Sequence, residues 1–303
     1  MASDATRIIA VTGASGMIGS ALVQSLRRDG HRIVRLVRRP AVRPDESFWD
    51  PTAGIIDAAR LEGIDGVVHL AGENLAGGLW TDARKRRIRE SRVQGTSLLA
   101  TTLAGLISPP GVMVSASAIG YYGDRGDTVV TEAAPNGRGF LAEVVQVWES
   151  SADPARERGI RVAHPRFGVV LAREGGMLPK MLLPFRLGLG AQLGSGSQWL
   201  SWTTLRDVVA AIRFLLDQEV GGALNVTAPA PVTNREFTRV LAQALHRPAL
   251  MAIPRFVLEL VLGDLAREAL LSSTRAIPGR LQELGFRFQD STLKPALENL
   301  LQA

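Results

Sequence analysis

Three glycines near the amino terminus have the spacing of a phosphate-binding turn. Gly13, Gly16 and Gly19 follow the apolar run Ile8–Val11 and open an amphipathic segment. The first glycine permits a tight turn, the second lets the backbone approach a pyrophosphate, and the third lets a helix pack closely on its strand. The amino terminus of that helix offers free N–H groups and a partial positive charge to phosphates. This context predicts a dinucleotide site formed by Thr12, Gly13, Ser15, Gly16, Met17, Ile18 and Gly19.

Arginines at the end of the second predicted strand bear on which dinucleotide binds. An NAD site has an acidic residue about 20 residues past the glycine turn, where it holds the ribose hydroxyls. This chain has Arg38 and Arg39 there, with Arg35 nearby. Because a guanidinium fork matches a phosphate dianion, we expect NADP(H) and assign Arg38 and Arg39 to its extra phosphate. The alternative is a basic turn that merely faces solvent.

A second backbone contact with the cofactor is expected where the apolar run Gly66–Leu70 ends. Leu70, Ala71 and Gly72 follow one another there, and a residue without a side chain suits close contact with ribose and nicotinamide. We therefore assign all three to the cofactor site. His69 lies within the same apolar run, and we interpret it as a core residue.

Composition bounds the classes of function that remain open. A chain of 303 residues has room for one large domain or two modest ones. No window is apolar and uncharged over the roughly 18 residues of a membrane helix, and no secretion signal is evident, so we expect a cytoplasmic protein. The absence of cysteine excludes disulfides, thiol nucleophiles and thiolate metal sites. No residue cluster suggests a metal.

The net charge of +6 does not by itself indicate nucleic-acid binding. The basic residues are scattered except in Arg84–Arg87, and no nucleic-acid-binding motif accompanies them. We interpret them as a solvated surface and expect no nucleic-acid partner.

Strand and helix patterns alternate through the first part of the chain. This order predicts a doubly wound parallel sheet of the Rossmann type with helices on both faces. Strands are expected at 7–11, 32–37, 66–70, 112–115 and 162–170. Helices are expected at 17–28, 81–106, 140–158 and 207–218.

The chain changes character after the turn-rich segment Ala228–Pro231. Thr233 and Glu236 have the spacing of a capping box, which opens a further helix. We predict an NADP(H)-binding domain over residues 1–225 and a smaller C-terminal α/β domain over 226–303. Residues 171–205 are a candidate contribution to the substrate lobe, and the glycine-rich segment 188–196 is expected to be a loop near the ligand.

Several segments resemble known families. The turn Thr12–Gly19 resembles that of the extended short-chain dehydrogenase/reductases. A set of less common segments resembles the atypical "epimerase family" proteins of that superfamily, and the tail is similar to their small C-terminal domain of unknown function. These segments are 70–74, 80–96, 117–123, 140–143 and 199–202, with 275–278 and 284–288 in the tail. The resemblance implies a nucleotide-sugar-epimerase-like fold with NADP(H) binding, and it implies no substrate.

The same resemblance bears on catalysis. Extended reductases use a serine after a sheet strand and a Tyr-x-x-x-Lys pair on the next helix. Matching the segments assigns the serine to Ser117, with Ser115 as second choice, and places Phe140 and Val144 at the tyrosine and lysine positions. A benzyl ring donates no proton and an isopropyl group carries no charge. The usual catalytic pair is therefore absent.

Other residues could replace that pair. Tyr121 and Tyr122 are the only tyrosines in the chain, and either could act as an acid or simply pack in a loop. Glu143 could act as a general base, provided that it is buried, or be a surface charge. Arg92 stands where the extended family usually has asparagine. It could anchor an anionic substrate or pair with an acid.

A second departure from the relatives follows the segment Trp199–Trp202. Thr204 and Arg206 stand where relatives tend to have a histidine and an acid, whereas Asp207 still fits as the anchor of a helix start.

The residues together favour an NADP(H)-dependent oxidoreductase or epimerase that acts on a small-molecule substrate. In this interpretation Ser117 polarises the reacting oxygen, and Tyr121 or Glu143 handles the proton. The competing hypothesis is a non-catalytic NADP(H)-binding sensor or interaction protein, which the missing Tyr-Lys pair favours. Family analogy also suggests a homodimer through the helices at 81–106 and 140–158.

Overall fold

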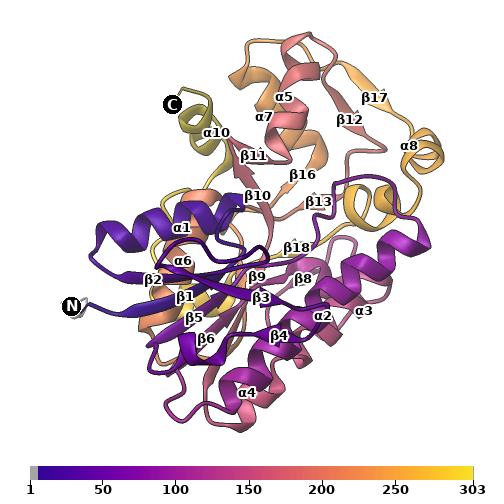
Figure 1. The fold of residues 1–303 in the computed structure, drawn as a ribbon. Helices are drawn as coiled ribbons and strands as arrows, with labels where there is room; N and C mark the ends of the chain where they lie inside the picture. The colour runs from indigo at the N-terminus through magenta and orange to yellow at the C-terminus, as the bar shows by residue number, and fades with distance from the viewer. Residues whose placement is uncertain (1–5, 303) are drawn as a thin grey trace.

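The computed structural model describes residues 6–302, which fold into two lobes (Figure 1). The larger lobe is built on one sheet. Its strands are β1 (Ile8–Thr12), β2 (Arg32–Val37), β3 (Glu46–Asp50), β4 (Ile55–Ile56), β5 (Gly66–His69), β6 (Val112–Ser115), β7 (Ser117–Ala118), β9 (Arg161–Phe167) and β15 (Gly222–Val226). The strand order is β15-β9-β6-β5-β1-β2-β3-β4, with β7 also paired to β9. All neighbours run parallel except β3 and β4.

Helices cover both faces of this sheet. Leucines and isoleucines of α1 (Met17–Arg28) and α6 (Leu205–Asp217) form one core with the sheet, and those of α2 (Asp82–Ala104) form another on the opposite face. The predicted Rossmann architecture is thereby confirmed. The helices after β1 and β5 lie on opposite faces, which makes the carboxyl ends of these two neighbouring strands the expected ligand crevice.

The prediction of one continuous helix over residues 140–158 is wrong. The structure has two helices, α3 (Phe140–Ser150) and α4 (Asp153–Glu157). Pro154 lies in the first turn of α4, where a missing N–H is tolerated. Within a continuous helix the same proline would remove a hydrogen bond and clash with the preceding turn.

The smaller lobe has a core of its own, and the chain reaches it from both sides of residue 225. Leu171, Phe185 and Trp202 pack there with Phe237 and Leu297. Its elements are β10 (Val169–Ala172), β11 (Gly175–Gly176), α5 (Leu178–Arg186), β12 (Ala191–Leu193), β13 (Trp199–Leu200), β14 (Trp202–Thr204), β16 (Val232–Thr233), α7 (Asn234–Ala244), β17 (Met251–Ile253), α8 (Arg255–Leu262) and α10 (Leu293–Gln302).

Two expectations for this lobe were wrong. The strand predicted over 162–170 ends at Phe167, and Val169 begins β10 in a different sheet. Gly168 makes this change possible, because a Cβ there would overlap the carbonyl oxygen of Ser201. The segment 188–196 is also not a loop throughout, since it contains β12, which pairs with β17 from the later part of the chain.

The capping box predicted at Thr233 is confirmed in part. The Thr233 side chain accepts a hydrogen bond from the backbone N–H of Glu236 at the start of α7. For α6, however, the capping side chain is Thr204 and not Asp207. The Asp207 carboxylate instead accepts hydrogen bonds from the backbone of Gln289 and Asp290.

The last part of the chain returns from the smaller lobe to the larger one. β18 (Arg275–Ala276) pairs with β8 (Val129–Val130), and Phe286 and Phe288 pack on the core that contains α6. Thr204 and Arg206 both bond to Asp290, so the two departures from the relatives fasten this returning segment.

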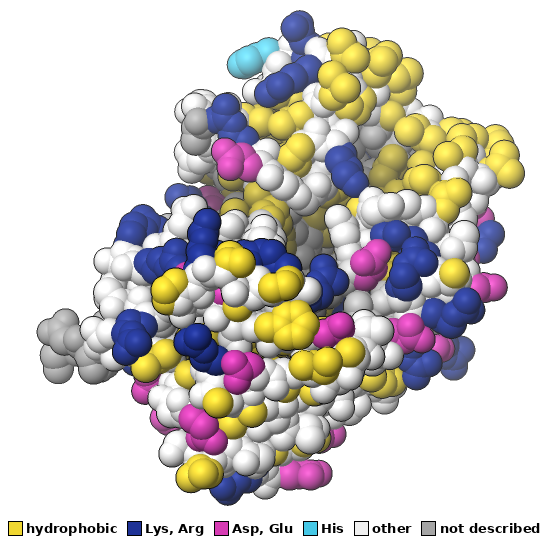
Figure 2. Space-filling view, in the orientation of Figure 1, with side chains coloured by type: hydrophobic (Ala, Val, Ile, Leu, Met, Phe, Trp, Pro, Cys, Tyr) yellow, Lys and Arg dark blue, Asp and Glu magenta, His cyan; other side chains and the backbone are white. Residues whose placement is uncertain are grey.

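Figure 2 shows a hollow between the lobes, with lysine and arginine side chains along its lower rim. Apolar side chains gather on the upper lobe in the same view, over α5, β17 and α8. Among residues 6–302, no helix combines the length and the apolar character that crossing a bilayer requires.

Candidate functional site

The glycine turn lies between β1 and α1 at the carboxyl edge of the sheet. Gly13 has a φ of 64°, and a Cβ on it would come within 2.8 Å of the Leu70 backbone. A Cβ on Gly19 would overlap the carbonyl oxygen of Gly13. Helix α1 begins after Gly16 without a side-chain cap, so the N–H groups of its first turn remain available. This arrangement fits the phosphates of a dinucleotide.

Thr12 joins the two strand ends that border the crevice. Its buried hydroxyl accepts hydrogen bonds from the backbone of Leu70 (3.0 Å) and Ala71 (3.2 Å) and bonds to Nδ1 of His69 (2.8 Å). The hydroxyl of Thr12 is thus engaged within the protein, and its contribution to the crevice is to hold the ends of β1 and β5 together. Gly72 follows directly, and a Cβ there would meet only the side chain of Arg92, at 3.5 Å.

His69 is confirmed as a core residue. It is completely buried, and its ring meets Trp49 edge-on with centroids 5.9 Å apart. Burial lowers the pKa of His69 to about 4, so the ring is neutral at physiological pH.

The arginines after β2 have different partners. Arg39 bonds to both oxygens of the buried Glu46 at 2.6 and 2.8 Å, and Arg35 bridges Asp45 and Glu46. The hydrogen bond from Arg39 lowers the pKa of Glu46 to about 2. Arg38 is exposed and makes no side-chain hydrogen bond or ion pair within residues 6–302. It is therefore the arginine whose guanidinium is available to a ligand phosphate.

The smaller lobe touches both sides of the cofactor crevice. The hairpin of β10 and β11 lies against the glycine turn, where a Cβ on Gly175 would come within 2.8 Å of the sulfur of Met17. Lys180, in α5, donates to the carbonyl oxygen of Ala76, in the loop after β5, at 3.0 Å. The side chain of Met17 is thus contacted by the other lobe, whereas its backbone N–H belongs to the uncapped first turn of α1.

The two residues that the resemblance assigns to the positions of the usual catalytic pair are packing side chains. The ring of Phe140 meets Trp80 edge-on with centroids 5.5 Å apart, and Val144 is buried. Neither side chain can move a proton. Any proton chemistry at this end of the crevice requires other residues.

A hydrogen-bonded network instead surrounds Ser117. Its hydroxyl donates to Oε1 of Glu149 at 2.5 Å, and Glu149 accepts two further hydrogen bonds from Arg166 at 2.7 and 2.8 Å. Burial alone would raise the pKa of Glu149, but the hydrogen bonds and charge of Arg166 outweigh it and hold that pKa below its ordinary value. Arg166 also donates to the hydroxyl of Tyr122 (3.0 Å), which in turn donates to Asn225 (2.7 Å).

The two tyrosines play different parts in this network. Tyr122 is buried, which raises its pKa, and its hydroxyl is engaged on both sides. Tyr121 is half-buried under the guanidinium of Arg166, 3.4 Å from its ring centroid. Its hydroxyl makes no hydrogen bond within the described part of the chain. Tyr121 is thus the tyrosine with a free hydroxyl.

The other two candidates differ from Ser117 and Tyr121. Glu143 is exposed on α3, which is not the burial that its role as a base requires. Ser115 is buried, as Ser117 is, but its hydroxyl has no hydrogen-bond partner among residues 6–302.

Glu149 and Arg166 were missed by the sequence analysis. One signal could have found them. Arg166 is a charged residue near the end of the otherwise mostly apolar strand Arg161–Phe167, and a buried charge needs a partner. The sequence does not say which acid supplies it.

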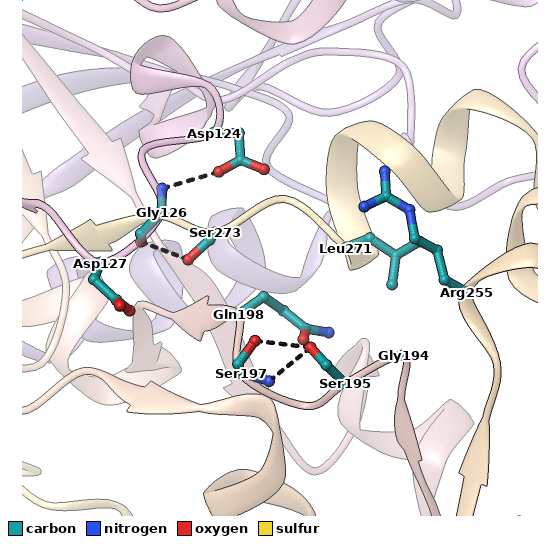
Figure 3. A pocket seen from close by; sticks show the side chains of 10 residues that line it. All are labelled: Asp124, Gly126, Asp127, Gly194, Ser195, Ser197, Gln198, Arg255, Leu271 and Ser273. Atoms are coloured by element: carbon teal, nitrogen blue, oxygen red, sulfur yellow. Dashed lines mark hydrogen bonds between the residues drawn. The ribbon is translucent and has the colours of Figure 1, made fainter.

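A polar pocket of about 480 Å³ opens where the lobes meet (Figure 3). It is lined by the loop that carries Asp124 and Asp127 in the larger lobe and by Gly194, Ser195, Ser197, Gln198, Arg255, Leu271 and Ser273. The loop that carries the two aspartates follows Tyr122 directly and is held by a hydrogen bond from Ser273 to the carbonyl oxygen of Gly126 (2.7 Å). None of the residues assigned to the cofactor or to catalysis lines this pocket.

Comparison with known proteins agrees with this geometry. A family model described as the NAD dependent epimerase/dehydratase family matches residues 9–227, and a domain of unknown function matches residues 253–300. An epimerase family protein from Mycobacterium bovis is 42% identical over 294 residues, which cover 97% of each chain.

Two solved structures are also similar. The human epimerase family protein SDR39U1 (isoform 2), crystallised with NADPH, is 32% identical with a TM-score of 0.88, over 97% of this chain and 99% of that chain. A nucleoside-diphosphate sugar epimerase from Corynebacterium glutamicum is 35% identical with a TM-score of 0.82, over 98% of this chain and 59% of that one. The fold, the glycine turn and these matches together show that the chain belongs to the NAD dependent epimerase/dehydratase family.

Proposed function

We propose that the protein is an NADP(H)-dependent oxidoreductase or epimerase that acts on a small-molecule substrate. The observation that carries this proposal is Arg38, which is exposed and unpaired within residues 6–302 and follows β2, the strand paired with β1 and its glycine turn before an uncapped helix. Arg35 and Arg39 compensate the nearby carboxylates of Asp45 and Glu46, so these do not oppose a bound phosphate. The human relative, crystallised with NADPH, supports the same choice of cofactor.

The residues of the crevice divide the binding of NADP(H) among them. The first turn of α1 binds the pyrophosphate, Arg38 binds the additional phosphate, and the backbone from Leu70 to Gly72 lies along the nicotinamide half. When bound, the cofactor supplies or accepts a hydride.

Ser117 and Tyr121 are the side chains that we place at the reacting oxygen of the substrate. Because the hydrogen of Ser117 is held by Glu149, its oxygen is oriented to accept a hydrogen bond from a substrate hydroxyl. The free hydroxyl of Tyr121 can donate or accept the proton. Glu149 and Arg166 are positioning residues, since they reach the substrate only through Ser117 and Tyr121.

Calorimetric titration with NADPH, NADH and their oxidised forms tests the cofactor assignment. We expect Arg38→Ala to weaken NADPH binding by roughly 10- to 100-fold, the worth of a charge-assisted hydrogen bond, and to leave NADH binding unchanged. Arg60→Ala removes another exposed arginine and serves as the matched control. An equal loss for NADH would refute the phosphate assignment, and no binding of any dinucleotide would refute the function.

A non-catalytic NADP(H) sensor is the second candidate, and the packing of Phe140 and Val144 favours it. The two functions differ in turnover. An oxidoreductase should reduce NADP⁺ with some member of a panel of alcohols and sugars, whereas an epimerase should invert a hydroxyl-bearing carbon of a panel member with no net change in the cofactor. Both Ser117→Ala and Tyr121→Phe should slow the reaction. Tight NADPH binding without turnover on any panel member would favour the sensor.

A further inference from the structure

We propose that Arg92 is an anion-binding residue of the ligand crevice and holds a carboxylate or phosphate group of the substrate. The inference rests on the proposed function, because it places the substrate next to the nicotinamide half of the cofactor. It adds a substrate class, an anionic small molecule.

The position of Arg92 is the first argument. It lies on α2, and its guanidinium carbon would be 3.5 Å from a Cβ on Gly72, just past the carboxyl end of β5. In a doubly wound sheet, ligands bind outside the carboxyl ends of the strands where the chain changes faces, here β1 and β5. With a pyrophosphate at the start of α1, the far end of β5 borders the nicotinamide half and the substrate.

The hydrogen bonds of Arg92 are the second argument. Its Nη1 donates to the carbonyl oxygens of Glu73 (3.1 Å) and Ile88 (3.0 Å), and the guanidinium lies 5.0 Å from the ring of Trp148. Nε and Nη2 donate to no residue in the described part of the chain. The planar guanidinium is therefore held in place from one side, with N–H groups left for a ligand.

The charge of Arg92 is the third argument. Within residues 6–302, no carboxylate lies within 4.0 Å of the Arg92 guanidinium, the distance of an ion pair. The Arg166 guanidinium, by contrast, is paired with Glu149. The nearby carboxylate of Glu73 points to Arg84, 3.5 Å away. A half-buried cation without a partner is unfavourable, and a bound anion would compensate it.

A purely structural role is the competing explanation. Arg92 could do no more than fasten the loop after β5, because it bonds to the carbonyl oxygen of Glu73. Arg84 does the same for this loop through the carbonyl oxygen of Asn74, at 2.5 Å. Arg84→Gln is therefore a matched control that loosens the loop and leaves Arg92 in place.

The experiment is calorimetric titration of the NADPH-saturated protein with succinate and glycerol phosphate, and with succinamide and glycerol as neutral counterparts. We expect the anions to bind and the neutral compounds not to bind. Arg92→Gln should weaken anion binding on the order of tenfold or more, Arg92→Lys should restore part of it, and Arg84→Gln should not change it. The Kd for NADPH should stay within about threefold in Arg92→Gln.

Several outcomes would overturn the proposal. These are no anion binding by the wild type, unchanged anion binding in Arg92→Gln, and an equal loss in Arg84→Gln. A matching loss of NADPH affinity in Arg92→Gln would mean that this arginine binds the cofactor's own phosphates. If the wild type failed to bind NADPH, the proposed function would fall, and the same titrations on the cofactor-free protein would still test Arg92.

Discussion

The two ends of the ligand crevice lie on one edge of the same sheet, but only one of them has the residues that the family resemblance leads us to expect. At the glycine turn, Gly13, Gly16 and Gly19 occupy the places that a dinucleotide requires. At the other end, Phe140 packs on Trp80 and Val144 is buried, at the positions to which the resemblance assigns the usual catalytic pair. There, a buried network joins Ser117 to Asn225 through Glu149, Arg166 and Tyr122.

The difference follows from what each end must provide. A phosphate is bound by backbone N–H groups and by the absence of side chains, and these requirements are met within a few consecutive residues. Proton transfer is performed by side chains, whose partners come from distant parts of the chain. The cofactor end therefore keeps a local pattern, whereas the reaction end can be rebuilt from several strands and helices.

The largest effect is expected from breaking the network at Glu149. Glu149→Ala leaves Arg166 buried without a counter-charge and should lower the free energy of unfolding by about 3–5 kcal/mol, measured by urea denaturation. Glu143→Ala, on the exposed face of the same helix, should change it by less than about 0.5 kcal/mol. A variant at Glu149 as stable as the control would show that the network is dispensable.

Acid should destabilise the larger lobe, because its strands β5 and β9 each contain a buried neutral histidine. Burial lowers the pKa values of His69 and His164 to about 4, below the ordinary value near 6.5. Between these values the unfolded chain binds more protons than the folded one. Stability should therefore fall as the pH drops from about 6.5 to about 4, by up to about 3 kcal/mol for each histidine.

A further loss should follow at lower pH, because the pKa of Glu149 is held below its ordinary value. Its contribution is present above the unfolded pKa and disappears as the pH falls through the folded one.

The measurement for the histidines is urea unfolding between pH 6.5 and 4 for the wild type and for His69→Gln. An unchanged slope between pH 6.5 and 4 in the variant would contradict the assignment of His69.

A smaller effect on stability is expected from two alanine substitutions in the glycine turn. Gly19→Ala should cost about 1–3 kcal/mol and abolish NADPH binding, because its Cβ overlaps the backbone of Gly13. Gly16→Ala, where the Cβ would meet only the Gly13 oxygen at 3.3 Å, should retain the fold and lose affinity. Thermal unfolding and NADPH titration on both proteins separate the two roles. Equal stability loss would contradict this distinction.

Particular elements show how much of the fold can be predicted from the sequence. The strands β1, β2, β5 and β6 and the helix α1 follow from apolar runs and the glycine spacing, and they lie close to where these patterns place them, whereas β3 and β15 were not predicted. The break between α3 and α4 and the change of sheet at Gly168 were not predicted. The break depends on Pro154, which is tolerated in the first turn of a helix. The change of sheet depends on the close approach of the Ser201 carbonyl oxygen to Gly168.

The same contrast holds among charged side chains. The sequence shows Arg38 and Arg39 as equivalent neighbours, but only the structure shows that Arg39 is bound to Glu46. The sequence also leaves open whether Arg92 pairs with an acid, and it does not indicate that Glu149 is the partner of Arg166.

The sequence by itself determined the sheet, the glycine turn and the absence of the usual tyrosine and lysine. These depend on residue type and on spacing within one or two elements. The tertiary structure decided which arginine after β2 stays exposed and unpaired within residues 6–302, which tyrosine hydroxyl makes no hydrogen bond there, and which carboxylate holds Ser117. Each of these depends on side chains that are distant along the chain and become partners only when the sheet and its two lobes assemble.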